Sequence, residues 1–461
     1  MISKFDVAIV GGGPGGYVAA IRAAQLGKTV ALIEESNLGG TCLNKGCIPT
    51  KAILKSADVL QQSKHSEVYG VKNESTIANL QSIIDRAKGV IHGLRQGVTG
   101  LMNKNKITVF EKKAVLKDRN TISAGDIEIT AQNIVIATGS KPRIFPGLED
   151  LISKGLIWTS KEAINPTYLP NKILIVGSGA IGIELASFYN SLGSDVTVVE
   201  IQDSILIQED IEISSAARQS FQKKGIKIKA KSKVEEYVES CGKVLTTIKN
   251  ADSTTEKEIF DTVILAVGVV PNTGDLGLEK IGIKTKANGE IIVNEFNQTS
   301  ISNIYAIGDI TEAPWLAHKA SREGVIVAEH ISGKNETKKS VIPACTYSNP
   351  QIASVGLTEE KAKEVSKNIK VGKSYFRGNG KALAAGESEG FVKVIFDGDT
   401  GELLGAHMIG HKVTELIALF SLAITSELTE TEFMNTVFPH PTITEVIQEA
   451  VLSAYGKALH G

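Results

Sequence analysis

A strand–turn–helix–strand pattern occurs twice in this chain, and each copy ends in a glutamate. In the first copy an apolar strand at 7–10 precedes a glycine turn and a helix at 17–26. The strand that follows, at 28–33, ends at Glu34. The turn has GxGxxG spacing and consists of Gly11, Gly13 and Gly16. The glutamate lies 18 residues after the third glycine, at the end of the second strand.

The second copy repeats each part in the same order. A strand at 172–176 precedes the turn and a helix at 183–192. The next strand, at 195–199, ends at Glu200, again 18 residues after the third glycine. The glycines of this turn are Gly177, Gly179 and Gly182. Two matched copies are much harder to produce by chance than one, so the sequence predicts two dinucleotide-binding domains.

Each part of the pattern has a physical role in binding a dinucleotide. Glycines allow a tight turn and let the backbone approach a pyrophosphate, and the helix presents free N–H groups to that anion. Glu34 and Glu200 lie where a carboxylate accepts hydrogen bonds from a ribose diol. Two such sites predict two dinucleotides, and the usual pairing is a flavin with a nicotinamide, so we expect FAD and NAD.

Three further apolar strands end in glycine or in glycine and aspartate. Strands at 133–139 and 261–268 end in Gly139 and Gly268, and each returns the chain to one of the two sheets. We expect both glycines to border a cofactor site. A third strand ends in Gly-Asp at Asp309, whose carboxylate could bond the ribityl or pyrophosphate part of a flavin. A simple turn aspartate is the alternative interpretation.

Length and charge exclude several other classes of protein. A chain of 461 residues is too long for one hydrophobic core, so roughly two to four domains are expected. The 50 basic and 51 acidic side chains nearly cancel, which gives no electrostatic reason to expect a nucleic acid or a membrane as partner. No segment approaches the ~18 apolar residues of a membrane span. A strand begins almost at the first residue, which leaves no room for a signal peptide, so we expect a cytoplasmic or already processed organellar protein.

Cys42 and Cys47 lie in the segment GGTCLNKGCIPTK at 39–51. A regular helix separates residues five apart by ~7.5 Å along its axis, more than the ~4.4–6.8 Å between Cα atoms that a disulfide accepts. A bridge therefore needs a loop or a distorted helix start, which Gly46 and Pro49 favour. Such a bridge closes a short loop and is easily reduced, which indicates a redox pair.

Zinc binding is the main alternative for the two thiols. Without a second Cys or His pair nearby they fall short of a four-ligand site, so we predict no metal. The isolated Cys241 and Cys345 are expected to be small buried hydrophobic residues.

His440 and Glu445 frame the segment HPTITE near the C-terminus. Thiol exchange needs a group that takes a proton from the incoming dithiol, and histidine titrates in the useful range. Glu445 could orient the imidazole and stabilise its charged form. A lone histidine is more often structural, so the residues alone leave both interpretations open.

Together these motifs resemble those of the pyridine nucleotide–disulfide oxidoreductases, and GGTCLNKGCIPTK is most similar to the redox motif of the dihydrolipoamide dehydrogenases. The resemblance covers essentially the whole chain, including TGS at 138–140, GD at 308–309 and HPTxxE at 440–445. It implies an α/β fold with two Rossmann-like domains, for FAD and NAD, and a C-terminal α+β dimerisation domain. The expected segments are the FAD domain, the NAD domain, the remaining FAD or central domain, and the dimerisation domain, at 1–143, 144–268, 269–340 and 341–461.

The resemblance also implies roles for individual residues. Cys42 would be the interchange thiol that meets the substrate, and Cys47 the thiol that faces the flavin. Lys51 would pair with Glu184 beside the flavin ring. His440 would act as base with its partner carboxylate, across the interface of a homodimer. Further expected cofactor contacts are Ala114, Thr138, Ser140 and Ala317.

The implied activity is oxidation of protein-bound dihydrolipoamide to lipoamide, with reduction of NAD⁺ through the disulfide and FAD. Glu200 favours NAD because a carboxylate at the ribose would repel the 2′-phosphate of NADP. The implied partners are the lipoyl domains of 2-oxo acid dehydrogenase complexes or a glycine-cleavage carrier protein. A glutathione- or mercuric-reductase-like enzyme and a flavoprotein scaffold without turnover are the alternatives. Two departures from the family's pattern, at Lys45 and Phe438, leave the expected catalytic residues in place.

Overall fold

The computed structural model describes residues 2–334 and 340–460, and the chain divides into two compact units. The first unit consists of Met1–Ile53, Gln81–Arg143 and Gly268–Lys339. The second consists of Leu54–Leu80, Ile144–Val267 and Ser340–Gly461. Both contain a sheet with a parallel part of the Rossmann type, and the second also contains two antiparallel sheets. The predicted α/β fold class is confirmed, whereas the finer segment boundaries stay a prediction.

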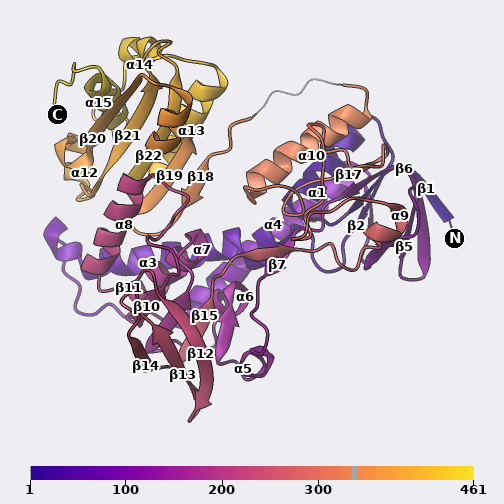
Figure 1. Cartoon of the computed structure of the whole chain (residues 1–461), viewed down its shortest axis with the longest axis horizontal. Coiled ribbons are helices and arrows are strands. Elements are labelled where there is room, and N and C mark those ends of the chain that lie inside the picture. Colours follow the sequence, from indigo (N-terminus) through magenta and orange to yellow (C-terminus); the bar gives the residue numbers. More distant parts are fainter. Residues whose placement is uncertain (1, 335–339, 461) are drawn as a thin grey trace. The chain divides into compact units, whose positions relative to one another are not determined.

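A seven-stranded sheet forms the centre of the first unit (Figure 1). Its parallel part has the order β3-β2-β1-β6-β17. Strand β6 also pairs with β5, and β5 with β4, both antiparallel. The strands are β1 (Ile2–Val10), β2 (Val30–Ile33), β3 (Thr108–Phe110), β4 (Ala114–Leu116), β5 (Thr121–Ala124), β6 (Ile127–Ile136) and β17 (Ile304–Ala306). Val10 pairs with Ile33 on one side and Ile136 on the other. The carboxyl ends of these strands therefore meet at one edge, where sheets of this kind bind ligands.

Helices α1 (Pro14–Gln25) and α10 (Ala317–Ile331) lie side by side in the first unit (Figure 1). Helix α1 begins at Pro14 rather than at residue 17 as the pattern predicts, because proline suits the first helical position after the cap at Gly13. This unit also contains α2 (Gly40–Lys45) and α9 (Leu278–Ile281), the start of α3 (Cys47–Lys64), and all of α4 (Leu80–Lys104) but its first residue. The short strands β7 (Ser140–Pro142) and β16 (Val269–Pro271) pair where the chain leaves the unit and returns to it.

In the second unit the parallel sheet has the order β11-β10-β9-β15-β8. Its strands are β8 (Ile157–Thr159), β9 (Lys172–Val176), β10 (Asp195–Val199), β11 (Lys227–Lys229) and β15 (Thr262–Leu265). The predicted strands at 172–176 and 195–199 are confirmed as β9 and β10. The remaining elements of this part include the helices α5 (Glu149–Ser153), α6 (Ser160–Ala163), α7 (Ala180–Leu192) and α8 (Ile211–Lys223), and the antiparallel strands β12 (Lys233–Ser240), β13 (Lys243–Lys249) and β14 (Thr255–Phe260).

The larger antiparallel sheet of this unit has the order β18-β19-β22-β21-β20. Its strands are β18 (Ala344–Thr346), β19 (Gln351–Gly356), β20 (Ile369–Tyr375), β21 (Gly390–Asp397) and β22 (Leu403–Gly410). The associated helices are α11 (Glu359–Val365), α12 (Gly380–Ala384), α13 (Val413–Thr425), α14 (Glu430–Asn435) and α15 (Glu445–Ala454). Alternate residues of the central strands, such as Val392, Val394 and Phe396, are fully buried in one core with α13 and α15.

A buried lysine ties α8 to this antiparallel sheet. Lys393 of β21 is fully buried, and its Nζ lies 2.9 Å from Asp210 Oδ1, 2.8 Å from Glu212 Oε2 and 2.7 Å from Glu359 Oε2. Although burial opposes its charge, hydrogen bonds to these carboxylates raise the pKa of Lys393. Asp210 also caps α8, since it accepts from the Glu212 amide. The acids therefore compensate the buried charge, and the lysine fixes the start of the helix.

Glu209, the residue before that cap, gives the fold a predicted pH dependence. Burial raises the pKa of its carboxyl from 4.5 to about 6, although a hydrogen bond with Ser354 opposes the shift. The stability that this group contributes is therefore fully present below pH 4.5 and is lost as the pH rises through about 6. In Glu209→Gln we expect the unfolding free energy, relative to wild type, to be about 1–2 kcal/mol higher at neutral pH than in acid. Urea denaturation of both proteins at the two pH values measures this, and an equal difference at both would contradict it.

The two isolated cysteines, Cys241 and Cys345, differ in their exposure to solvent. The prediction that Cys241 is buried is wrong: it is exposed in the turn between β12 and β13, where its φ is +52°. Cys345 in β18 is half-buried.

Within the described residues, no helix has both the length and the apolar character needed to cross a membrane.

Candidate active site

The two glycine turns have nearly the same backbone geometry. Gly11 and Gly177 have φ values of +105° and +100°, in the region that favours glycine. A Cβ on Gly16 would lie 1.8 Å from the Gly11 carbonyl oxygen, and one on Gly182 would lie 2.1 Å from that of Gly177. The first and third glycines of each turn are therefore required by the packing of the chain itself.

The middle glycines are different, because the chain has room for a side chain there. Gly13 and Gly179 cap α1 and α7 with φ values of −69° and −67°, which any residue adopts. A Cβ on Gly13 would find its nearest neighbour 3.9 Å away, and one on Gly179 would find nothing within 4 Å. Neither helix start has a side-chain cap, so amide N–H groups of the first turn remain for a ligand. This combination fits the close approach of a pyrophosphate to both turns.

The glutamate of each copy is held beside its turn. Glu34 Oε2 accepts from the Gly12 amide at 2.7 Å, and Oε1 accepts from the Ser36 amide at 2.8 Å. In the second copy, Glu200 Oε2 accepts from the amide and hydroxyl of Ser178 at 2.9 and 2.6 Å. These bonds fix the orientation of both carboxylates, as recognition of a ribose diol requires.

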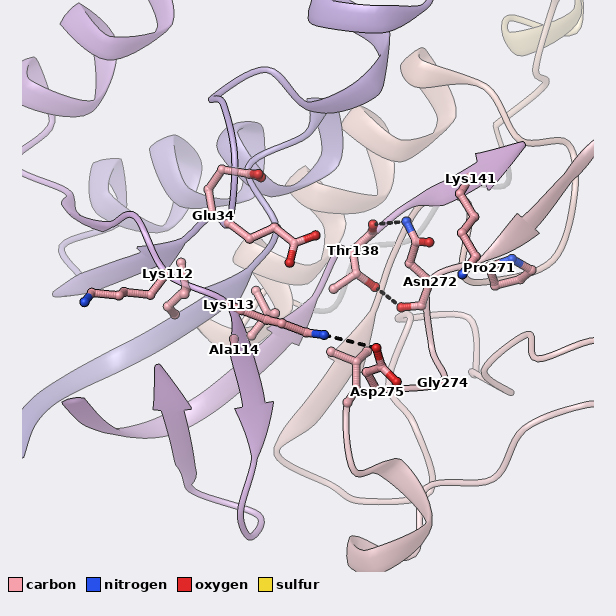
Figure 2. Close-up of a pocket in the computed structure, with 15 residues that line it drawn as sticks. Glu34, Lys112, Lys113, Ala114, Thr138, Lys141, Pro271, Asn272, Gly274 and Asp275 are labelled. Atoms are coloured by element: carbon pink, nitrogen blue, oxygen red, sulfur yellow. Dashed lines mark hydrogen bonds and ion pairs between the residues drawn. The ribbon is translucent and has the colours of Figure 1, made fainter. Parts of the chain in front are cut away.

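A cavity of about 340 Å³ lies beside the turn in the first unit (Figure 2). It is lined by Val10, Gly11, Ile33, Glu34, Glu35, Lys112, Lys113, Ala114, Thr138, Lys141, Pro271, Asn272, Gly274, Asp275 and Leu276. Thr138 and Asn272 form two hydrogen bonds: the Thr138 hydroxyl donates to the Asn272 backbone carbonyl (2.8 Å), and the Asn272 side-chain amide donates to the Thr138 backbone carbonyl (3.0 Å). Lys113 Nζ donates to Asp275 Oδ2 at 3.0 Å. The cavity thus brings Glu34, Ala114 and Thr138 together, and it is large enough for part of a dinucleotide.

Asp309 and Ser140, both expected at a cofactor, contact each other in the first unit. The Ser140 hydroxyl donates to Asp309 Oδ2 at 2.7 Å. Burial raises the pKa of Asp309, and the Ser140 bond and the nearby Lys319 oppose the shift. Ala317 is the first residue of α10, whose start has no side-chain cap. Gly139 and Gly268 have φ values of +67° and +90° with open space around a Cβ, so only their backbone conformation requires glycine.

The dithiol lies at a break between two helices, as the spacing predicts. Cys42 is in α2 and Cys47 begins α3, and Gly46 between them has φ −146° and ψ −108°. The Thr50 hydroxyl donates to the Gly46 carbonyl at 2.6 Å and stabilises the break. A Cβ on Gly40 would lie only 2.6 Å from the Gly13 Cα, so α2 packs directly against the first glycine turn.

Both cysteines are half-buried thiols in the structure. A hydrogen bond with the Cys47 thiol, together with burial, raises the pKa of Cys42, and the positive charge of Lys51 opposes the shift. The two thiols therefore interact directly, and the positive charge of Lys51 favours the thiolate form of Cys42. Lys45, which departs from the family's pattern, is exposed to solvent.

His440 and Glu445 form a pair at the start of α15 in the second unit. Glu445 Oε1 lies 2.8 Å from His440 Nδ1, and Glu445 Oε2 accepts from the Thr442 amide at 2.8 Å. These bonds to His440 and Thr442 lower the pKa of Glu445. The imidazole side chain is 80% exposed, whereas that of Glu445 is 28% exposed. The pair has the geometry of a base and its orienting carboxylate.

The two units divide the expected site residues between them. The flavin-side residues and the dithiol belong to the first unit, and the second glycine turn, Glu184, Glu200, His440 and Glu445 belong to the second. Glu184 is buried and accepts from the Tyr347 amide at 2.8 Å. Since Lys51 belongs to the first unit, its pairing with Glu184 stays a prediction.

Two polar residues that line the cavity, Asn272 and Asp275, are not among the site residues expected from the sequence. A turn-forming run, Pro-Asn-Thr-Gly-Asp at 271–275, soon after the strand end at Gly268 is the signal that could have found them. In residues 2–334 and 340–460, no group of three or more His, Cys, Asp or Glu side chains could hold a metal ion.

Family models and known proteins that match nearly the whole chain are disulfide oxidoreductases. Residues 5–324 match the pyridine nucleotide-disulphide oxidoreductase family, and residues 342–451 match the dimerisation domain of that family. Proteins named dihydrolipoyl dehydrogenase from Rhizobium etli and Bacillus subtilis are 46% and 42% identical over the full length of both chains. Among solved structures, the HOCl-induced flavoprotein disulfide reductase RclA from Escherichia coli matches with a TM-score of 0.87 and 26% identity, over 97% of this chain and 99% of that one.

Proposed function

Because the chain belongs to the pyridine nucleotide-disulphide oxidoreductase family, we propose that it is a dihydrolipoyl dehydrogenase that uses FAD and NAD⁺. The Cys42–Cys47 dithiol at a break between two helices carries the proposal, because a bridge there is redox-active rather than structural. Full-length similarity to relatives of that name supports the choice within the family.

The reaction begins with the oxidised Cys42–Cys47 disulfide. One sulfur of dihydrolipoamide attacks Cys42 Sγ, the bond to Cys47 breaks, and Cys47 leaves as a thiolate. The second substrate sulfur then attacks the substrate sulfur of the mixed disulfide, and its bond to Cys42 breaks. Lipoamide is released, and the second proton of the dithiol passes to Cys42, which is left as a thiol. His440 takes a proton from the substrate dithiol, and Glu445 stabilises the resulting imidazolium.

The two glycine turns fit the two dinucleotides that this chemistry needs. Glu34, Asp309 and the start of α1 would hold FAD, and Glu200 with the start of α7 would hold NAD⁺. When bound, FAD and NAD⁺ supply the path by which two electrons leave the dithiol, so that NADH and a restored disulfide result.

The chain forms a homodimer through its dimerisation domain. We propose that its protein substrates are lipoyl domains of 2-oxo acid dehydrogenase complexes or a glycine-cleavage carrier protein, because such domains carry the dihydrolipoyl group that relatives of this name oxidise. The cytoplasmic location is also a proposal, which cell fractionation tests.

An assay of purified protein with dihydrolipoamide and NAD⁺ tests the activity. We expect NADH to form in proportion to lipoamide. Turnover of glutathione disulfide or Hg²⁺ with NADPH instead would identify another reductase of the family. A flavin-containing protein without any of these activities would support the scaffold alternative.

Coenzyme choice is a separate prediction that rests on Glu200. Asp203 follows it by three residues and pairs with Lys231, whose Nζ lies 3.5 Å from Asp203 Oδ2. Glu200→Val combined with Asp203→Lys removes two negative charges, adds a cation and frees Lys231 from its pairing with Asp203. We expect the NADP-to-NAD ratio of kcat/KM to rise about 100-fold, roughly tenfold from each substitution. Asp203→Lys alone is the control and should still prefer NAD. A wild-type preference for NADPH would contradict the role of Glu200.

A further inference from the structure

Glu323 and Lys319 of α10 form a largely buried pair beneath the turn that carries Asp309. Glu323 Oε2 accepts from the Gly308 amide at 2.7 Å, and Glu323 Oε1 lies 2.6 Å from Lys319 Nζ. Both side chains are only 13% exposed. A buried carboxylate bonded to one specific backbone amide is costly unless it is neutralised, and Lys319 provides that charge.

Both peptide groups of Gly308 are bonded, so the turn has little freedom. Its amide donates to Glu323, and its carbonyl accepts from the amide and hydroxyl of Thr311 at 3.0 and 2.8 Å. Lys319 Nζ also contacts the Thr311 hydroxyl at 3.3 Å. Gly308 itself has φ +76°, and as a glycine it could adopt several other backbone conformations if these bonds did not hold it. These bonds set the direction in which the next residue, Asp309, leaves the turn.

The close packing of α10 on α1 holds Glu323 within hydrogen-bonding distance of the Gly308 amide. A Cβ on Gly324 would lie 2.6 Å from the Gly15 carbonyl oxygen and 3.1 Å from the Ala19 amide nitrogen. Ala320 contacts the positions where a Cβ on Gly15 or Gly308 would lie. The helix that carries Glu323 therefore packs against the same helix that begins at the first glycine turn.

We propose that Glu323, with Lys319 as its counter-ion, is a positioning residue for the Asp309 carboxylate at the FAD site. The inference rests on the proposed function in that Asp309 is taken to bind FAD. Glu323 acts through the Gly308 amide and does not itself contact the cofactor. Lys319 also keeps the Glu323 charge from repelling the anionic pyrophosphate.

The test measures FAD binding to the apoprotein by titration, together with flavin release and the thermal midpoint of each variant. We expect Glu323→Ala to weaken FAD binding about tenfold, which corresponds to loss of one charge-assisted hydrogen bond from a misplaced Asp309 carboxylate to the cofactor. Glu323→Gln should restore part of that affinity, because its amide oxygen can still accept from Gly308. Glu329→Gln is the matched control: on the same helix it loses an ion pair, 2.5 Å to Arg22, that is remote from the turn. It should bind FAD as the wild type does.

A double-mutant cycle with Asp309→Asn separates positioning from general stability. If Glu323 acts through Asp309, Glu323→Ala should cost much less FAD affinity in the Asp309→Asn background than in the wild type. Equal costs in both backgrounds, or an equal loss in Glu329→Gln, would overturn the proposal. Should Glu323→Ala fail to fold, the same cycle with Glu323→Gln decides. A wild-type apoprotein that binds no FAD would instead overturn the proposed function.

Discussion

Cys47→Ser chains and His440→Ala chains, each nearly inactive alone, should regain about a quarter of wild-type activity when they are refolded together. The dithiol belongs to the first unit of the chain, whereas His440 lies in the second, within the segment that matches the dimerisation domain. If each site combines the dithiol of one chain with the base of its partner, one site of a mixed dimer carries both lesions and the other carries none.

The expected yield follows from random pairing. About half of the dimers are mixed and half of their sites are intact, which gives the quarter. Each parent should lose about 10²–10⁴-fold in turnover for His440→Ala, the usual worth of a general base, and at least as much for Cys47→Ser. The recovery is therefore measured against a very low background, by NADH formation with dihydrolipoamide.

Mixing Cys47→Ser with Cys42→Ser provides the matched control. Both lesions then affect the dithiol, which one chain supplies to each site, so every site of the mixed dimer keeps one lesion and no activity should return. If the first mixture also stays inactive although the subunits have exchanged, the site is built within one chain.

Features decided by neighbouring residues could be predicted from the sequence. Strands β9 and β10 have the predicted bounds, because an apolar run between turn residues is a local signal. The break at Gly46 was predictable because disulfide geometry rules out a regular helix between Cys42 and Cys47. The predicted start of α1 at residue 17 is wrong. The helix begins at Pro14, because proline favours the first helical turn.

Contacts between distant segments could not be predicted in the same way. Asn272 bonds Thr138 across 134 residues, and Lys393 bonds Asp210 across 183. The sequence around Lys393, whose neighbours in β21 are apolar, does not indicate which acids neutralise its charge. Glu323 looks like an ordinary polar position of an amphipathic helix until the turn at Gly308 is seen beside it. Polar residues that position a site are therefore found only once the sheets and helices are assembled.

The middle glycines of the two turns offer a test that separates the two cofactors. Gly13 and Gly179 have φ values that any residue adopts, and a Cβ would meet only the Gly40 Cα, at 3.9 Å, in the first case and nothing within 4 Å in the second. A larger side chain there should therefore leave the fold intact. If a pyrophosphate lies against each turn, valine would instead occupy the space of the ligand and separate it from the helix N–H groups.

We therefore expect Gly13→Val to be purified without FAD and Gly179→Val to keep its yellow flavin but lose NAD. Loss of two or more hydrogen bonds to an anion corresponds to at least about 100-fold weaker binding. Flavin absorbance, NADH titration of the holoprotein and the thermal midpoint of each apoprotein are the measurements. Each variant is the control for the other, since both place the same side chain at the same position of a matched turn. Normal NADH binding by a folded Gly179→Val protein would show that the start of α7 does not hold the nicotinamide dinucleotide, and FAD retained by Gly13→Val would show the same for α1.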